Sequence, residues 1–316
     1  MKTMKKYVLS LVALCLGQWL VAQNIDVKVD PDIEIDVNGI AQQMVTEVMN
    51  EFEFDFDFDD DDDDDDKRKY QQSSQEVEIP LSKPGERGTL KVDSRNGRIT
   101  IKGYDGPTVK VKIIKFSKKV DKSAEGGMRL VSSGGFNFEA SEYNNTVEVE
   151  NEGWGNRADF EIMVPKNFNI EAESYNNGHI TISDVEGELD IESYNGPITL
   201  ENISGSASAS TYNGAVKVSF SQLTPDVPMT FNTYNGDVDI SVPAGSKFST
   251  KMRTNRDIFT DFENFTLSNP EPTTRRSENR RGYSVKYENW VQGDLNGGGS
   301  EVTMKTRNGN IYIRKM

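Results

Sequence analysis

From Val77 to the C-terminus, apolar and polar residues alternate with a period of two, and no long stretch has helical periodicity. Such alternation is typical of β-strands that bury one face. In residues 186–193, for example, Leu189, Ile191 and Ser193 share one face, and acidic residues occupy the other. The pattern predicts an all-β fold.

A turn motif recurs between the predicted strands: a hydroxyl residue, then Tyr or Arg, then Asn and Gly. It occurs at residues 94–97, 193–196, 211–214, 233–236 and 306–309, and with one inserted residue at 174–178. The glycines at 178, 196, 214 and 236 are 18, 18 and 22 residues apart. A repeat of this length predicts a parallel β-helix, or β-solenoid, with one coil per repeat. We expect irregular or antiparallel strands toward the ends, in residues 108–164 and 250–301.

Asn-Gly also favours two-residue hairpins, so each motif could instead join two antiparallel strands. Against this alternative, residues 187–205 contain two strands and a third apolar point at Ile203, after which the pattern begins again. Coils stacked in parallel would place equivalent side chains about 4.8 Å apart. The regular repetition favours the solenoid.

The parity of the strands orients the motif. Its hydroxyl residue shares a face with the apolar residues, so Ser or Thr points inward and the next residue points outward. Asn and Gly tolerate left-handed backbone conformations, and stacked amides can hydrogen-bond along the solenoid. The residues expected to form the turns are Gly97, Asn177, Gly178, Asn195, Gly196, Asn213, Gly214, Asn235, Gly236, Asn308 and Gly309.

The outward residue is a tyrosine in four repeats, Tyr175, Tyr194, Tyr212 and Tyr234, and an arginine in the first and last. Stacked coils would therefore carry an aromatic stripe, which predicts either a surface that binds a glycan or peptide or a purely structural stiffening of the corner. Arg95 and Arg307 are expected to belong to capping coils, whose polar faces prevent end-to-end stacking.

The net charge of −15 is concentrated near the N-terminus. Residues 1–76 hold 19 acidic and 7 basic residues, a balance of −12, so the rest of the chain carries only −3. Residues 1–22 have a positive start, an apolar stretch and a small-residue cleavage site, as in a signal peptide; an uncleaved anchoring helix is the alternative. The only cysteine, Cys15, lies in this segment, so the mature chain has no disulfide or thiolate site.

Residues 23–76 form an acidic low-complexity segment, which we expect to be mostly disordered, and the β-domain covers residues 77–316. Eight consecutive aspartates, Asp59 to Asp66, suggest calcium, but they lack the spaced ligands and glycine turn of a calcium loop, so loose counter-ion binding is the better interpretation. Before them, Phe52, Phe54, Phe56 and Phe58 alternate with acids and would lie on one face, either docked on the domain or free to bind a partner.

The sequence offers little for catalysis. His179 is the only histidine, there is no phosphate-binding glycine loop, and no metal site or cofactor is predicted. No basic stripe indicates a nucleic-acid partner, and no internal run is long enough for an integral membrane protein. Paired carboxylates of a carbohydrate-active enzyme remain an alternative, with no pair singled out among Asp184, Glu186, Glu188, Asp190, Glu192, Asp237 and Asp239.

The order of motifs resembles the bacterial putative-adhesin family of β-strand repeat proteins, relatives of the head GIN domain adhesins. The resemblance rests on the first Arg-Asn-Gly unit, a Val164-Pro165 step, the Asn-Gly coils, a Val242-Pro243 step and the final Arg-Asn-Gly unit. It covers residues 77–316 and implies a right-handed β-helix that is exported from the cell, with no settled function. The tyrosines before Asn and the acidic N-terminal segment depart from the family pattern.

We therefore expect an exported, non-enzymatic cell-envelope protein, located in the periplasm, at the cell surface or outside the cell. Its expected role is that of an adhesin that binds a surface glycan or protein through the four tyrosines. The alternative is a structural or regulatory envelope component whose acidic, Phe-rich segment binds a basic partner. A carbohydrate-active β-helix enzyme is the third hypothesis.

Overall fold

The computed structural model describes residues 70–118, 138–151, 157–176, 178–268, 273–279, 282–288 and 290–316. The chain separates into two units, residues 1–59 and 60–316, and the described residues all belong to the second. The predicted signal peptide, the aspartate run, the alternating phenylalanines and Asn177 lie outside the described residues. Within the described ranges, no helix is long and apolar enough to cross a membrane.

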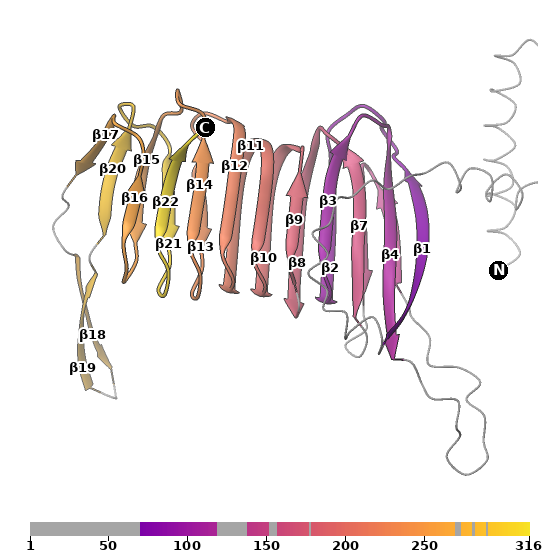
Figure 1. Ribbon diagram of the computed structural model, residues 1–316, viewed down its shortest axis with the longest axis horizontal. Helices are drawn as coiled ribbons and strands as arrows, with labels where there is room; N and C mark the ends of the chain where they lie inside the picture. Colours follow the sequence, from indigo (N-terminus) through magenta and orange to yellow (C-terminus); the bar gives the residue numbers. More distant parts are fainter. Residues whose placement is uncertain are drawn as a thin grey trace, which may run out of the picture. The chain divides into compact units, whose positions relative to one another are not determined.

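The strands pair into two rows that share one long strand, β11 (Ile198–Asn213), as Figure 1 shows. The first row holds the strands that precede the turns. In pairing order it runs β5 (Phe138–Tyr143), β6 (Thr146–Asn151), β2 (Gly88–Asn96), β8 (Phe168–Asn176), β10 (Glu186–Asn195), β11, β13 (Met229–Asn232), β21 (Glu301–Lys305), β15 (Phe248–Arg253), β20 (Val291–Leu295) and β17 (Phe265–Ser268).

The second row holds the strands that follow the turns. In pairing order it runs β1 (Tyr70–Pro80), β4 (Thr108–Lys118), β7 (Ala158–Pro165), β3 (Ile99–Tyr104), β9 (Ile180–Ser183), β11, β12 (Val216–Leu223), β14 (Val238–Val242), β22 (Ile311–Lys315) and β16 (Ile258–Thr260). A separate hairpin is formed by β18 (Thr273–Asn279) and β19 (Gly282–Glu288).

Parallel pairing decides between the solenoid and the hairpin. Strand β10 pairs in parallel with both β8 and β11, and the register places Ser193 beside Ser174 and Thr211, one repeat away on each side. The predicted β-solenoid is confirmed, and the hairpin alternative is wrong for these repeats. Antiparallel strands occur toward the ends, as expected: β4 and β5 at one and β17 and β20 at the other lie in the predicted ranges. Strand β1, which pairs with β4, begins at Tyr70, outside those ranges and before the predicted domain boundary.

The core is built from residues that stack in register between the two rows. Ile180, Ile198, Val216 and Val238 lie opposite one another in successive coils, and all four are fully buried. Each such side chain contributes about 1.5–3 kcal/mol through burial. A shift of one residue would move every one of them to the solvent face, so the register is strongly fixed.

The coils do not stack in sequence order. Strands β2 and β3 insert between the β6–β7 coil and the β8–β9 coil. Strands β21 and β22 insert between the β13–β14 coil and the β15–β16 coil. Arg95 and Arg307 therefore lie in internal coils, and the prediction that they belong to capping coils is wrong. Both coils gain hydrogen-bonded neighbours on two sides, and the antiparallel strands lie beyond the coils that flank them.

Candidate functional site

The hydroxyl residues of the motif form a buried ladder that ties the corners together. In every repeat but the first, where the hydroxyl of Ser94 is buried without such a bond, the side-chain hydroxyl donates a hydrogen bond to the glycine carbonyl of the neighbouring coil. The bond satisfies a group that would otherwise be buried without a partner. The bonds run from Ser193 to Gly178 (3.0 Å), Thr211 to Gly196 (2.9 Å), Thr233 to Gly214 (2.7 Å) and Thr306 to Gly236 (2.7 Å). The predicted inward orientation is confirmed, since these hydroxyl residues are all at most 8% exposed.

A second ladder consists of asparagine amides, each of which donates from Nδ2 to Oδ1 of the next. The bonds run from Asn195 to Asn176 (3.3 Å), Asn213 to Asn195 (2.8 Å), Asn235 to Asn213 (2.7 Å) and Asn308 to Asn235 (2.7 Å). In the repeat with the inserted residue, Asn176 takes this position, whereas sequence reasoning chose Asn177. The strand register places Asn96 beside Asn176, which is consistent with Asn176 as the ladder residue of this repeat.

The predicted left-handed backbone at the turn asparagines is wrong. Among the described residues, positive φ angles outside glycine occur at other positions, such as Asp184 and Asn202, and not at the asparagines of the motif. The glycines carry the unusual conformation instead, with φ of +144° at Gly97, +148° at Gly214 and +145° at Gly236. The asparagine side chains stay in line for the amide ladder without a left-handed backbone.

Close approach between coils explains glycine at every turn, including those without a positive φ. A Cβ atom on Gly309 would lie 1.9 Å from the carbonyl oxygen of Gly236 in the neighbouring coil. One on Gly178 would lie 2.1 Å from the hydroxyl of Ser174 in its own turn and 3.2 Å from that of Ser193 in the next coil. Any side chain would force the coils apart. The glycines are thus a packing requirement of the stack as well as a conformational one.

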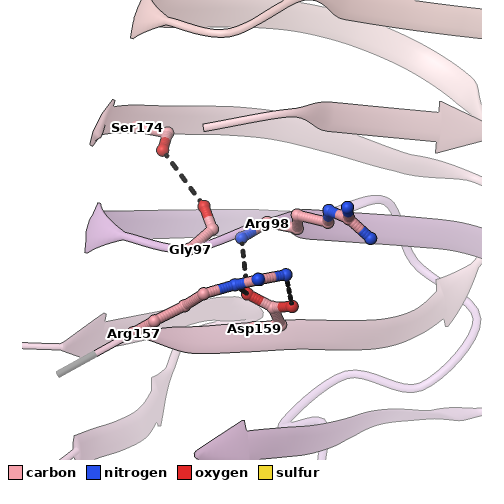
Figure 2. Close-up of polar contacts among 5 residues, drawn as sticks. All are labelled: Gly97, Arg98, Arg157, Asp159 and Ser174. Atoms are coloured by element: carbon pink, nitrogen blue, oxygen red, sulfur yellow. Dashed lines mark hydrogen bonds and ion pairs between the residues drawn. The ribbon is translucent and has the colours of Figure 1, made fainter. Parts of the chain in front are cut away.

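The corner at Gly97 shows how the ladder continues toward the β6–β7 coil (Figure 2). Ser174 donates to the carbonyl of Gly97 at 3.4 Å. On the other side, the carboxylate of Asp159 accepts a hydrogen bond from the backbone N–H of Arg98 at 2.9 Å and is held by Arg157 at 2.7 Å. Asp159 on β7 therefore anchors the backbone just after this turn with a charge-assisted bond.

The outward tyrosines form a continuous stack, the tyrosine ladder. Its ring centroids are 5.0 Å apart between Tyr175 and Tyr194, 5.3 Å between Tyr194 and Tyr212, and 4.8 Å between Tyr212 and Tyr234. Neighbouring rings are within 12° of parallel. The first three residues are 42–47% exposed.

Arginines stand at both ends of the tyrosine ladder. The Arg307 guanidinium lies 5.1 Å from the Tyr234 ring centroid and donates to the Tyr234 hydroxyl. At the other end, the pairing register places Arg95 beside Tyr175. The cation–π attraction of Arg307 stabilises the terminal ring of Tyr234. The aromatic stripe is therefore closed by a positive charge at each end.

An acidic row runs alongside the tyrosine ladder, two residues earlier on each strand. Asp93, Glu173 and Glu192 line a groove of about 520 Å³ together with Tyr175, Tyr194 and Tyr212. Burial raises the pKa of Glu173, and the negative charges of Glu192 and Asp93 raise it further. Sequence reasoning missed this row, although the parity that places the tyrosines outward places these acids on the same face.

The residues considered for catalysis are engaged in structural contacts or lie exposed on the outer faces of the strands. His179 is exposed, and its pKa is lowered by loss of water around the ring and by the positive charge of Arg98. Asp184 accepts from the amide of Asn202 at 2.6 Å, Asp237 from the backbone of Asn310 at 2.7 Å, and Asp239 pairs with Arg314 at 2.8 Å. No cluster of metal-binding side chains occurs in the part of the chain that the structure describes.

The family model of Toastrack DUF4097 matches residues 52–314. The chain belongs to the Toastrack DUF4097 family. This agrees with the β-strand repeat resemblance seen in the sequence, and the Toastrack match begins within the alternating Phe and acid segment. No curated protein matches the chain.

Two solved structures resemble this Toastrack chain at low identity. A putative cell adhesion protein from Clostridium sporogenes ATCC 15579 is 13% identical, with 78% of this chain and 100% of that chain covered and a TM-score of 0.38. A putative adhesin from Bacteroides fragilis NCTC 9343 is 8% identical, with 78% and 97% covered and a TM-score of 0.34.

Replacing Asn213 with alanine tests the amide ladder of this Toastrack domain. Asn213 donates to Asn195 and accepts from Asn235, so the variant loses both bonds and leaves Oδ1 of Asn195 and Nδ2 of Asn235 without their ladder partners. We expect a loss of about 1–3 kcal/mol in the free energy of unfolding, measured by urea denaturation. Asn255→Ala, at an exposed position, is the control. Equal midpoints for the two variants would show that the ladder contributes nothing.

Proposed function

We propose that this protein is an exported, non-enzymatic cell-envelope protein that binds an extended glycan or protein ligand along the tyrosine ladder. The observation that carries the proposal is the ladder itself: a row of partly exposed tyrosines, spaced about one coil apart, beside a groove lined by Asp93, Glu173 and Glu192. The hydroxyl and amide ladders beneath hold the row rigid, so little conformational entropy is lost when a ligand binds.

The stacked geometry determines which part of each ring a ligand meets. The inner rings cover one another's faces at about 5 Å, so the ring edges and hydroxyl groups are what the ladder offers to a ligand. Ring edges are the positive part of the aromatic quadrupole, and tyrosine hydroxyls both donate and accept hydrogen bonds. Together with the neighbouring carboxylates, they suit a ligand with many hydroxyl or N–H groups at regular spacing.

Binding of the full chain to a glycan array and an extracellular-matrix protein array tests this function. Each hot-spot tyrosine contributes more than about 1 kcal/mol to an interface, so Tyr194→Ser/Tyr212→Ser should weaken binding by about tenfold or more. Tyr143→Ser, 85% exposed and outside the ladder, should bind normally. Unchanged binding by the folded double variant would contradict the proposal.

A second double variant tests which atoms of the tyrosines contact the ligand. Tyr194→Phe/Tyr212→Phe keeps the stack and removes only the hydroxyls. If hydroxyls form the contact, this variant should lose most of the affinity that the serine variant loses. Retention of full affinity would assign the contact to the ring edges instead.

A further inference from the structure

The outer surface of the first row carries opposite charges at its two ends. The charged positions lie two and four residues before the Tyr or Arg of each repeat. On β6, which has no such motif, they are the residues paired with Lys91 and Asp93. On β6, β2, β8 and β10, the exposed residues at these positions are acidic: Glu148, Glu150, Asp93, Glu171, Glu173, Asp190 and Glu192. Lys91 also lies there and is paired with Glu171 at 2.7 Å.

The same positions become neutral and then basic along the row. On β11 and β13 they are Ser208, Ser210, Thr230 and Asn232, which are uncharged. On β21 and β15 they are Thr303, Lys305, Lys251 and Arg253. Lys251 and Arg253 lie 5.1 Å and 5.8 Å from the Trp290 ring centroid, and Arg307 follows two residues after the end of β21. The surface therefore runs from acidic through neutral to basic.

The acidic end is electrostatically costly when only water covers it. Asp93, Glu173 and Glu192 stand in register on adjacent strands. Like charges at such spacing repel by about 1 kcal/mol per pair in water. The raised pKa of Glu173, caused partly by Glu192 and Asp93, reflects the same crowding. A positively charged surface laid over this end would relieve the repulsion.

We propose that two copies of this chain pair through the outer surface of the first row, with the acidic end of each copy on the basic end of the other. Two identical faces can be related by a two-fold axis along the strands or along the stack of coils. An axis along the strands reverses the stack and brings acid onto base at both ends. An axis along the stack brings acid onto acid, so charge selects the first arrangement.

The residues at the centre of the face fit this arrangement. The axis would pass near β11, midway between the charged ends, where Ser208 and Ser210 face outward. Their small side chains allow the two sheets to approach closely. At about 4.8 Å per strand and 3.3 Å per residue, the face from β6 to β15 covers roughly 600 Å² per copy, close to the area of a standard interface. The two tyrosine ladders would then lie on the same side of the dimer, antiparallel to each other. Because the second copy would cover Asp93, Glu173 and Glu192, which line the groove beside the ladder, the second copy and a ligand in that groove would exclude each other.

Charge-reversal variants of the full chain test the proposed pairing of the two copies. Glu173→Lys/Glu192→Lys makes the face basic throughout, and Lys251→Glu/Lys305→Glu makes it acidic throughout. In sedimentation velocity at low salt, the wild type should be a dimer that weakens at least tenfold in 0.5 M NaCl, because screening removes most of the attraction. Each variant alone should be a monomer, and an equimolar mixture of the two should form a heterodimer.

Each result supports or overturns the proposal. A heterodimer requires both variants to be folded and supports the pairing directly. A wild type that stays monomeric at low salt, or two folded variants that do not pair when mixed, would overturn it. Glu201→Lys/Glu263→Lys, exposed acids away from this face, should leave the dimer intact. The Tyr194→Ser/Tyr212→Ser variant should still dimerise, so a failure of the ligand proposal is distinguishable from a failure of this one.

Discussion

A single methyl group at Gly214 is expected to destabilise the fold by about 3 kcal/mol or more, through backbone strain and overpacking together. Gly214 has a φ of +148°, a region that residues with a Cβ atom rarely adopt. Its added Cβ would lie 2.5 Å from the carbonyl of Gly196 and 2.6 Å from the nitrogen of Pro197. These are backbone atoms of the next coil, and the ladders on both sides prevent them from moving aside.

The matched control is Gly245→Ala. Gly245 is exposed in the loop after β14, and a Cβ there would meet no heavy atom within 4 Å. Urea denaturation of both variants compares their free energies of unfolding directly. We expect Gly245→Ala to change stability by no more than about 1 kcal/mol, in either direction. If the two alanine variants unfold at the same urea concentration, the coils do not require glycine at this corner.

Removal of residues 301–316 should abolish cooperative folding of the C-terminal end of the solenoid. The deleted strands, β21 and β22, lie inside the stack and pair with β13, β14, β15 and β16. Their loss leaves strand edges unpaired and uncovers Phe231, Val238 and Met252, which are fully buried. An unpaired edge and an exposed core favour aggregation. Limited proteolysis and circular dichroism would show the loss.

An equally long deletion provides the comparison. Residues 273–288 form the β18–β19 hairpin, whose strands pair only with each other among the described strands, and Thr273 lies opposite Glu288. A short linker therefore closes the gap. We expect this deletion to leave the melting temperature within a few degrees of the wild type. If the 301–316 deletion is tolerated equally well, the C-terminal coil is peripheral and the pairing order is wrong.

Two features of the sequence explain why much of this fold was predictable: the alternation of inward and outward residues along each strand, and the repeat length between turns. Because side chains on a strand alternate strictly between faces, Leu189 and Ile191 fix the inward position of Ser193 and the outward position of Tyr194. The nearly regular spacing of the turns, 18, 18 and 22 residues, indicates which residues become neighbours in the central coils. Fold class, stacked tyrosines and stacked asparagines all follow from these two facts.

Coil order could not be predicted in this way. Parity tells which face a residue occupies and not which strand lies beside it. The β2–β3 coil neighbours β8–β9, and 63 residues separate Tyr104 at the end of β3 from Phe168. The acidic row was missed for a related reason: Asp93, Glu173 and Glu192 look like ordinary solvent-facing acids on each strand, and only stacking brings them together in one groove.

The inserted coils also set the timing of folding. A polypeptide is synthesised from its N-terminus, yet β2 and β3 need β6 to β9 as their neighbours, and β15 and β16 need β21 and β22. The β2–β3 coil can be enclosed only after β6 to β9 have been synthesised, and the β15–β16 coil only after β21 and β22. Such non-local pairing slows folding. The C-terminal part of the stack therefore stays open until β21 and β22 have been synthesised.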